Sequence, residues 1–411
     1  MKMTTYKTRK KSNKQESIIF IDLPKRTNKV FVSIVFQFGF YNESKNTHGL
    51  THLLEHFIID FIQKKLSPLF IDGLVDNTYT RFDLNASKRE VVKHFSTTLK
   101  IISQPKFHDK ILLSNEKARI QTEFAEKYMD FKQWLGVEII QFLINSPIFV
   151  KRRRIEQIKN VEKASLRDLK RVHKLFMKYP HRIFISGYKL VPAQKKILSD
   201  IAQEFFKNQE RMRSKFTKIV YSPKRNKTIF HPTIFPKHVY HSLIFPAFSL
   251  QNSSISERIA LGFICIELKQ LFTQSMGKMG TYKTDYKYTI TGNYGFVAFF
   301  LYIPKESKNE CPKIIFNNIK KLLEQKDLKK KLEKYIVKKE KDLRQLWNGN
   351  ETRIDWVIDD LIDFGAIKYL SEVRRELKDV TLEKVGVVAR RIFNPVNLHA
   401  LTVVSHKKLN K

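Results

Sequence analysis

Apolar and polar stretches alternate along the chain, and they recur in a similar order in its two halves. Residues 30–39 are rich in β-branched and aromatic side chains and end at a glycine followed by a polar loop, so they predict a strand that leads into a helix. Residues 239–245 predict a strand that opens the second half in the same way. Further expected elements are strands ending near 187 and at 286–290, 295–303 and 398–404, and helices at 115–124, 192–206, 256–272 and within 312–346. This repeated order predicts a duplicated domain.

The length of 411 residues predicts two to three domains with ample core, and 42% hydrophobic residues is ordinary for a globular protein. We expect a basic, disordered tail at residues 1–15 and a first domain at 16–205. A polar linker is expected at 206–230, and a second domain of the same type at 231–411.

Features of the sequence also bear on its location. The basic segment at 1–15 lacks the apolar core of a signal peptide, and no stretch reaches the apolar length that spans a membrane. Cys265 and Cys311 are the two cysteines, so no disulfide framework is expected. These features predict a cytoplasmic protein.

The chain is strongly basic, with 77 Lys and Arg residues against 40 Asp and Glu residues and a net charge of +37. Such a charge attracts acidic peptides, nucleic acid, anionic membranes or an acidic partner. The basic residues are spread along the chain, and the compact clusters at 151–154 and 329–331 are typical of solvated faces. No phosphate-binding loop or nucleic-acid motif is present, so an acidic peptide is favoured over nucleic acid.

The segment His52-Leu53-Leu54-Glu55-His56 carries the candidate chemistry. On a helix, His52 and His56 are four residues apart and share a face, so both imidazoles can reach one metal ion, with Glu55 beside them as a proton acceptor. This is the H-x-x-E-H order of inverted zinc peptidase motifs. The alternative is a chance pentapeptide whose histidines belong to an ordinary helix.

A third ligand is required, because catalytic zinc typically has three protein ligands and one open position. Residues 115–124 predict a helix in which Glu116 and Glu123, seven positions apart, lie on one face. Glu123 is the candidate ligand. The alternative is a solvated helix face, since basic and acidic residues surround both glutamates.

Several of these segments together resemble the pitrilysin-type zinc peptidases, the family of insulysin and the mitochondrial processing peptidases. The resemblance rests on residues 39–43 and 49–56, on Asn77-Thr78-Tyr79-Thr80 in place of an Asn-Ala-x-Thr strand, and on the Glu116–Glu123 spacing. Residues 165–169 and 182–187 resemble the end of the family's first domain.

The resemblance implies an α+β fold of two similar domains, each a mostly antiparallel sheet packed with helices. It also implies one Zn²⁺ per chain, bound by His52, His56 and Glu123. Glu55 would take a proton from the attacking water and pass it to the leaving amine. Glu116 would orient a ligand histidine.

The resemblance further implies that extended substrate pairs with an edge strand, where Asn77 and Thr78 would contact its backbone. The family's second half often supplies an Arg and, seven residues later, a Tyr. Tyr282 matches the Tyr, but Ser275 occupies the Arg position. We therefore expect a heterodimer in which a sister chain supplies the missing Arg. The alternatives are a non-catalytic structural subunit and a chain that binds zinc and peptide without turnover.

Overall fold

The computed structural model describes residues 18–67, 70–144, 154–179, 181–207, 219–231, 234, 237–277, 281, 283–291, 294–364 and 367–405. The chain divides into two compact units. The first combines Met1–Tyr128 with Arg152–Lys215, and the second combines Met129–Lys151 with Phe216–Lys411. The tail expected at 1–15 lies outside the described residues.

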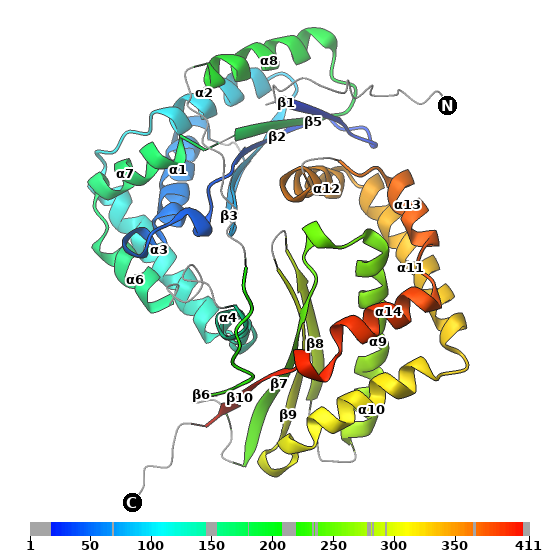
Figure 1. The fold of residues 1–411 in the computed structure, drawn as a ribbon. Helices are drawn as coiled ribbons and strands as arrows, with labels where there is room; N and C mark the ends of the chain where they lie inside the picture. Colours follow the sequence, from blue (N-terminus) through cyan, green and yellow to red (C-terminus); the bar gives the residue numbers. More distant parts are fainter. Residues whose placement is uncertain are drawn as a thin grey trace, which may run out of the picture. The chain divides into compact units, whose positions relative to one another are not determined.

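The first unit is built on a five-stranded sheet of order β1-β5-β2-β4-β3, in which β3 is an edge strand (Figure 1). Its strands are β1 (Ile18–Asp22), β2 (Lys29–Phe36), β3 (Phe70–Val75), β4 (Thr80–Ser87) and β5 (His181–Gly187). The β1–β5 pair is parallel, and the other pairs are antiparallel.

The helices of the first unit bury their apolar faces against this sheet and against one another. They are α1 (Leu50–Leu66), α2 (Val91–Ser103), α3 (Lys110–Met129), α6 (Arg154–Lys163), α7 (Leu166–Phe176) and α8 (Pro192–Phe206). Leu54 and Phe57 of α1 are almost fully buried, and Phe176 of α7 stacks on Phe36 of β2 with ring centroids 4.0 Å apart. This packing fixes the position of α1, while His52 and His56 on the same helix are only half-buried.

The second unit repeats the same sheet topology, in the order β6-β10-β7-β9-β8. Its strands are β6 (Asn226–Phe230), β7 (His238–Ala247), β8 (Lys283–Ile290), β9 (Gly295–Pro304) and β10 (His399–Val404). Its helices are α4 (Phe131–Leu143), α9 (Ile255–Gly277), α10 (Cys311–Leu323), α11 (Leu328–Asn348), α12 (Asn350–Asp363), α13 (Leu370–Lys378) and α14 (Leu382–Ile392). The predicted fold class, two similar α+β domains with mostly antiparallel sheets, is confirmed. No helix in the described ranges has both the length and the apolar character needed to cross a bilayer.

Helix α4 groups with the second unit, although its residues fall within the range 16–205 expected for the first domain. Phe131 and Trp134 pack on His231, with ring centroids 5.1 and 4.5 Å from the imidazole. The chain thus leaves the first unit after α3, contributes one helix to the second unit, and returns at α6.

Residues 226–230, expected within a linker, form strand β6. They pair in parallel with residues 400–404 of β10 and extend the second sheet by one edge strand. The first three residues of β6, Asn226, Lys227 and Thr228, are polar, and the strand is half-buried at alternate positions, so it lacks the apolar run of a core strand.

A buried histidine in the second sheet gives this unit a pH-dependent stability. Burial, with a smaller effect from Lys308, lowers the pKa of His241 to about 4. The residue is 5% exposed, and its ring is hydrogen-bonded through Nδ1 to the Thr402 hydroxyl at 3.0 Å. In the unfolded chain the imidazole binds a proton near pH 6.5, whereas the buried ring does so near pH 4. The contribution of neutral His241 to the unfolding free energy is therefore complete above pH 6.5 and is lost as the pH falls toward 4.

We expect His241→Gln to remove this dependence. Between pH 7 and pH 4, the wild type should lose about 3 kcal/mol more unfolding free energy than the variant. Urea unfolding at pH 7, 5.5 and 4 measures the difference. Parallel stability profiles for the two proteins would contradict the assignment.

Candidate metal centre

The loop before α1 fixes where that helix begins. Gly49 adopts a positive φ of 89°, and the carboxylate of Glu43 accepts hydrogen bonds from the backbone N–H groups of Gly49 and Thr51 at 2.9 and 2.8 Å. These bonds satisfy donors that the first helical turn leaves unpaired. The first turn of α1 is therefore well anchored, and the histidine motif follows directly.

The motif lies on α1 with both imidazoles on one face, as the spacing predicts. The rings of His52 and His56 have centroids 4.7 Å apart and are nearly perpendicular. Glu55 places Oε2 3.9 Å from His52 Nε2 and 3.7 Å from His56 Nε2. These three side chains form a cluster whose possible ligand atoms all lie within 4.8 Å of one another.

Helix α3 brings Glu123 to the same two nitrogens. Its carboxylate oxygens lie 3.6 Å from His52 Nε2 and 3.3 Å from His56 Nε2. Two atoms that each lie about 2.1 Å from a tetrahedral zinc ion are about 3.4 Å apart. Two imidazole nitrogens and a carboxylate at this spacing fit the donor set of a catalytic zinc ion.

Glu116, two turns before Glu123 on α3, contacts the imidazole nitrogen of His56 that faces away from Glu123. The Nδ1–H of His56 donates to Glu116 at 3.0 Å, which leaves Nε2 as the acceptor that faces Glu123. Arg119 also donates to Glu116, at 3.1 and 3.2 Å. A carboxylate behind a ligand histidine fixes both the tautomer and the ring orientation.

The electrostatics of the cluster follow from burial and from these contacts. Burial raises the pKa of Glu55 to about 7, and the nearby His56 charge offsets part of the rise. Burial lowers the pKa of His56, but the Glu116 hydrogen bond and the charges of Glu55 and Glu123 outweigh it, so the pKa is raised. For Glu116, burial raises the pKa, but His56 and Arg119 outweigh it and lower it. Glu55 is thus the carboxylate most ready to exchange a proton near neutral pH.

The site opens into a cavity of about 440 Å³ that is also lined by edge strand β3. Five consecutive β3 residues, 71–75, line it, and Gly73 faces Glu55 so closely that a Cβ would overlap the carboxylate. Sequence reasoning missed this segment. Its glycine, Gly73, was the available signal, because glycine within a strand marks a close approach of another group.

Asn77 and Thr78 are not in a strand, contrary to our expectation. They form the turn between β3 and β4, in which the N–H of Asp76 donates to the carbonyl of Tyr79 at 2.9 Å. Asp and Asn are common in such turns, because these residues accept the backbone conformations of a turn and their side chains form hydrogen bonds with nearby backbone groups. The described residues that line the cavity do not include this turn.

The two positions singled out in the second half have different outcomes. Tyr282 lies outside the described residues. Ser275 lies near the end of α9, where its hydroxyl donates to Asn318 Oδ1 at 3.0 Å. The side chain at the position matched to the family's Arg is therefore engaged in a contact within its own unit.

The contact behind His56 leads to a direct prediction. Glu116→Gln keeps the shape of the side chain but removes its charge. The imidazole of His56 then becomes a weaker and less well oriented ligand for the metal ion. We expect zinc affinity to fall about ten-fold or more. Competition against a chelating dye measures it. Arg119→Gln is the matched control, since it alters the other partner of Glu116; equal affinity of Glu116→Gln and wild type would contradict the role.

Comparison with known proteins identifies the fold. No protein-family model and no curated protein matches the sequence. Among solved structures, a protease from Helicobacter pylori matches with a TM-score of 0.74 at 13% identity, over 95% of this chain and 97% of that chain. A structure described as an M16-like peptidase from Alicyclobacillus acidocaldarius matches with a TM-score of 0.70 at 13% identity, over 96% of both chains.

A third match is a peptidase M16 inactive domain from Pseudomonas fluorescens, with a TM-score of 0.74 at 14% identity over 96% of this chain and 97% of that chain. The chain therefore has the fold of the M16, or pitrilysin-type, peptidases, and the predicted resemblance is confirmed at the level of the fold. One neighbour being an inactive domain means that the activity must be argued from the site.

Proposed function

We propose that this protein is a zinc-dependent endopeptidase of the pitrilysin type. The observation that carries the proposal is the approach of the Glu123 carboxylate to His52 Nε2 at 3.6 Å and to His56 Nε2 at 3.3 Å, beside a buried Glu55. The non-catalytic alternative is disfavoured because the full donor set and the neighbouring carboxylate are both retained.

In the proposed mechanism, His52, His56 and Glu123 would hold the metal ion. Zinc bound there would supply a Lewis acid that polarises the scissile carbonyl and lowers the pKa of a water molecule. Glu55 accepts the proton of the attacking water and then donates it to the leaving amine nitrogen. Its raised pKa suits a group that must accept and release a proton in one cycle.

The same proposal assigns a place to the substrate. Strand β3 is an edge strand beside the cluster, and an extended peptide can add to such an edge by backbone hydrogen bonds. We propose residues 71–75 as backbone contacts of the substrate. A contact from Asn77 or Thr78 stays a prediction. The net charge of +37 favours acidic peptides at the stage of encounter.

The experiment that tests the function compares peptide cleavage and zinc content in the wild type and Glu55→Gln. New internal termini, identified by mass spectrometry after incubation with a peptide mixture, would distinguish endopeptidase action from trimming at the ends. The location of the protein in the cytoplasm remains a prediction.

We also propose that the chain works with a sister subunit that supplies the Arg missing at Ser275. An Arg that hydrogen-bonds substrate through its charge is worth about 10- to 100-fold in rate. We therefore expect the purified chain alone to have a kcat/KM at least about ten-fold below that of the complex isolated from its own cells. Equal values for the chain alone and the native preparation would contradict the heterodimer but not the zinc mechanism.

A further inference from the structure

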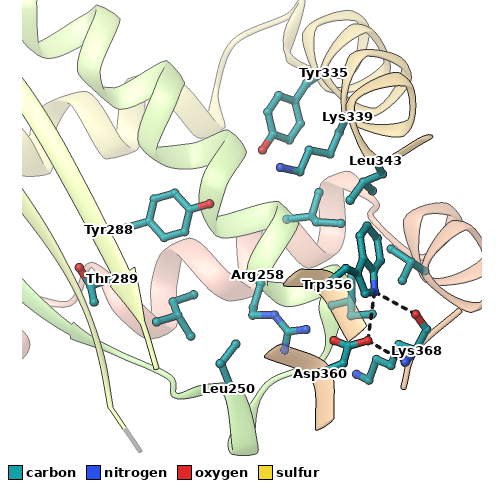
Figure 2. A pocket seen from close by; sticks show the side chains of 14 residues that line it. Leu250, Arg258, Tyr288, Thr289, Tyr335, Lys339, Leu343, Trp356, Asp360 and Lys368 are labelled. Carbon is teal, nitrogen blue, oxygen red and sulfur yellow. Dashed lines mark hydrogen bonds between the residues drawn. The ribbon is translucent and has the colours of Figure 1, made fainter. Parts of the chain in front are cut away.

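The second unit contains a cavity of its own, of about 540 Å³, which the proposed peptidase function does not use (Figure 2). It lies among β8, α9, α11, α12 and the start of α13. Apolar side chains form much of its wall: Ile255, Ile259, Leu343 and Val373. A cavity of this size with a largely apolar wall matches the usual dimensions of small-molecule sites.

Two phenol groups meet inside this cavity, above a glycine of α9. A Cβ added to Gly262 would lie 2.8 Å from the Tyr335 hydroxyl oxygen and 3.5 Å from that of Tyr288, so both oxygens are near one point. Glycine within a helix costs about 1 kcal/mol relative to alanine. Here it allows the Tyr335 hydroxyl to approach the helix.

Both hydroxyls are available as donors. Neither the Tyr288 nor the Tyr335 hydroxyl has a hydrogen-bond partner in the part of the chain that the structure describes. Burial raises the pKa of both phenols, so each keeps its proton at neutral pH. Two unpaired O–H groups directed at one region favour a ligand that accepts hydrogen bonds.

A lysine adds positive charge at the same place. Lys339 lies one helical turn after Tyr335 on α11, and Figure 2 shows both side chains directed into the cavity. Among the described residues, Lys339 has no ion-pair partner. Helix α11 carries eight basic and three acidic residues, so the mouth of the cavity lies in a field that attracts anions.

The other charged groups of the lining leave this balance positive. Arg258 and Lys368 are basic, and Asp360 is the one acid among the described lining residues, which gives three positive charges against one negative. Asp360 already accepts hydrogen bonds from the Trp356 indole at 3.1 Å and from the Lys368 backbone N–H at 2.7 Å (Figure 2). It is therefore occupied, and the cavity as a whole favours an anion.

We propose that this cavity binds a small organic carboxylate with an apolar body, such as a medium-chain fatty carboxylate. The carboxylate would accept hydrogen bonds from the Tyr288 and Tyr335 hydroxyls and from the Lys339 ammonium group. The apolar body would lie against the aliphatic side chains of α9, α11 and α13.

The test uses the full chain and decanoate as the probe, with binding measured by isothermal titration calorimetry. Decanol has the same apolar body without the charge, and acetate has the charge without the body. We expect decanoate to bind at least about ten-fold more tightly than either. Failure of decanoate to bind the folded wild type, or equal binding of decanoate and decanol, would overturn the proposal.

Variants then locate the site. We expect Lys339→Gln to weaken decanoate binding about ten-fold or more, and Tyr335→Phe to weaken it several-fold, since the loss of a charged partner costs more than that of a neutral one. Lys338→Gln is the matched control, because it removes the same charge from an exposed neighbour on α11 that does not line the cavity. Circular dichroism checks that each variant is folded. Equal losses for Lys338→Gln and Lys339→Gln would show a general charge effect and overturn the proposed site.

Discussion

Glu55→Gln is expected to reduce peptide cleavage by about three orders of magnitude while zinc content stays at the wild-type level. Glutamine matches glutamate in size, so it fits the narrow space against Gly73. Its amide cannot accept the proton of the attacking water. Zinc would remain because His52, His56 and Glu123 are untouched. The measurements are kcat for peptide cleavage and zinc by mass spectrometry of the purified protein.

The control and the opposing outcomes separate two roles for this residue. Glu126→Gln, at an exposed position of α3, removes one negative charge from the same unit and should leave cleavage unchanged. Full cleavage by Glu55→Gln would refute the mechanism. Loss of zinc together with activity would instead make Glu55 a metal ligand. Its carboxylate is close enough for that role, because the possible ligand atoms of His52, Glu55 and His56 lie within 4.8 Å of one another.

The helical part of the site was predictable because helix geometry is local. The four-residue spacing of His52 and His56 and the seven-residue spacing of Glu116 and Glu123 fix which side chains share a face, whatever the rest of the fold does. Local spacing does not tell whether the face of α1 with the histidines packs on the face of α3 with the glutamates. That expectation came from the family resemblance, and in the structure His56 lies between Glu116 and Glu123.

The strand beside the site was misplaced for a physical reason. Residues 77–80 match the letters of a family strand, but Asp76 and Asn77 are turn-forming residues, and the hydrogen bond from Asp76 to Tyr79 closes a hairpin there. The turn-forming pair Asp76-Asn77 was visible in the sequence, but the strand was placed by the match of residues 77–80 to the family's strand motif instead. The edge strand therefore ends at Val75, just before the matched letters.

The position of α4 could not be inferred from its own sequence. Trp134 and its apolar neighbours predict a buried face, but burial does not specify a partner. In the structure, that face packs on the second unit through His231, and Glu138 pairs with Lys227 at 3.3 Å. Such a non-local exchange of one helix between units is set by tertiary contacts that periodicity does not encode.

Removal of a metal ligand is expected to abolish both zinc binding and cleavage, and two ligands should differ in a second property. His56→Ala and Glu123→Gln each leave two ligands, so we expect less than about 0.1 zinc per chain after dialysis and no measurable cleavage. The side chain of Glu123 is 35% exposed, so its replacement disturbs little else. His56 in contrast is a hydrogen-bond partner of Glu116, whose side chain is 3% exposed.

Without zinc, the two variants should therefore differ in stability. His56→Ala leaves the buried Glu116 carboxylate with Arg119 as its hydrogen-bond partner among the described side chains. The variant should cost roughly 1–2 kcal/mol of unfolding free energy relative to the zinc-free wild type. Glu123→Gln should be close to neutral. Urea unfolding of all three proteins in excess EDTA measures this difference, and zinc titration of the wild type adds the stabilisation that ligand binding to the folded state must give. Equal stabilities of the two variants would remove Glu116 from the role of orienting His56, and zinc retained by either variant would remove that residue from the metal centre.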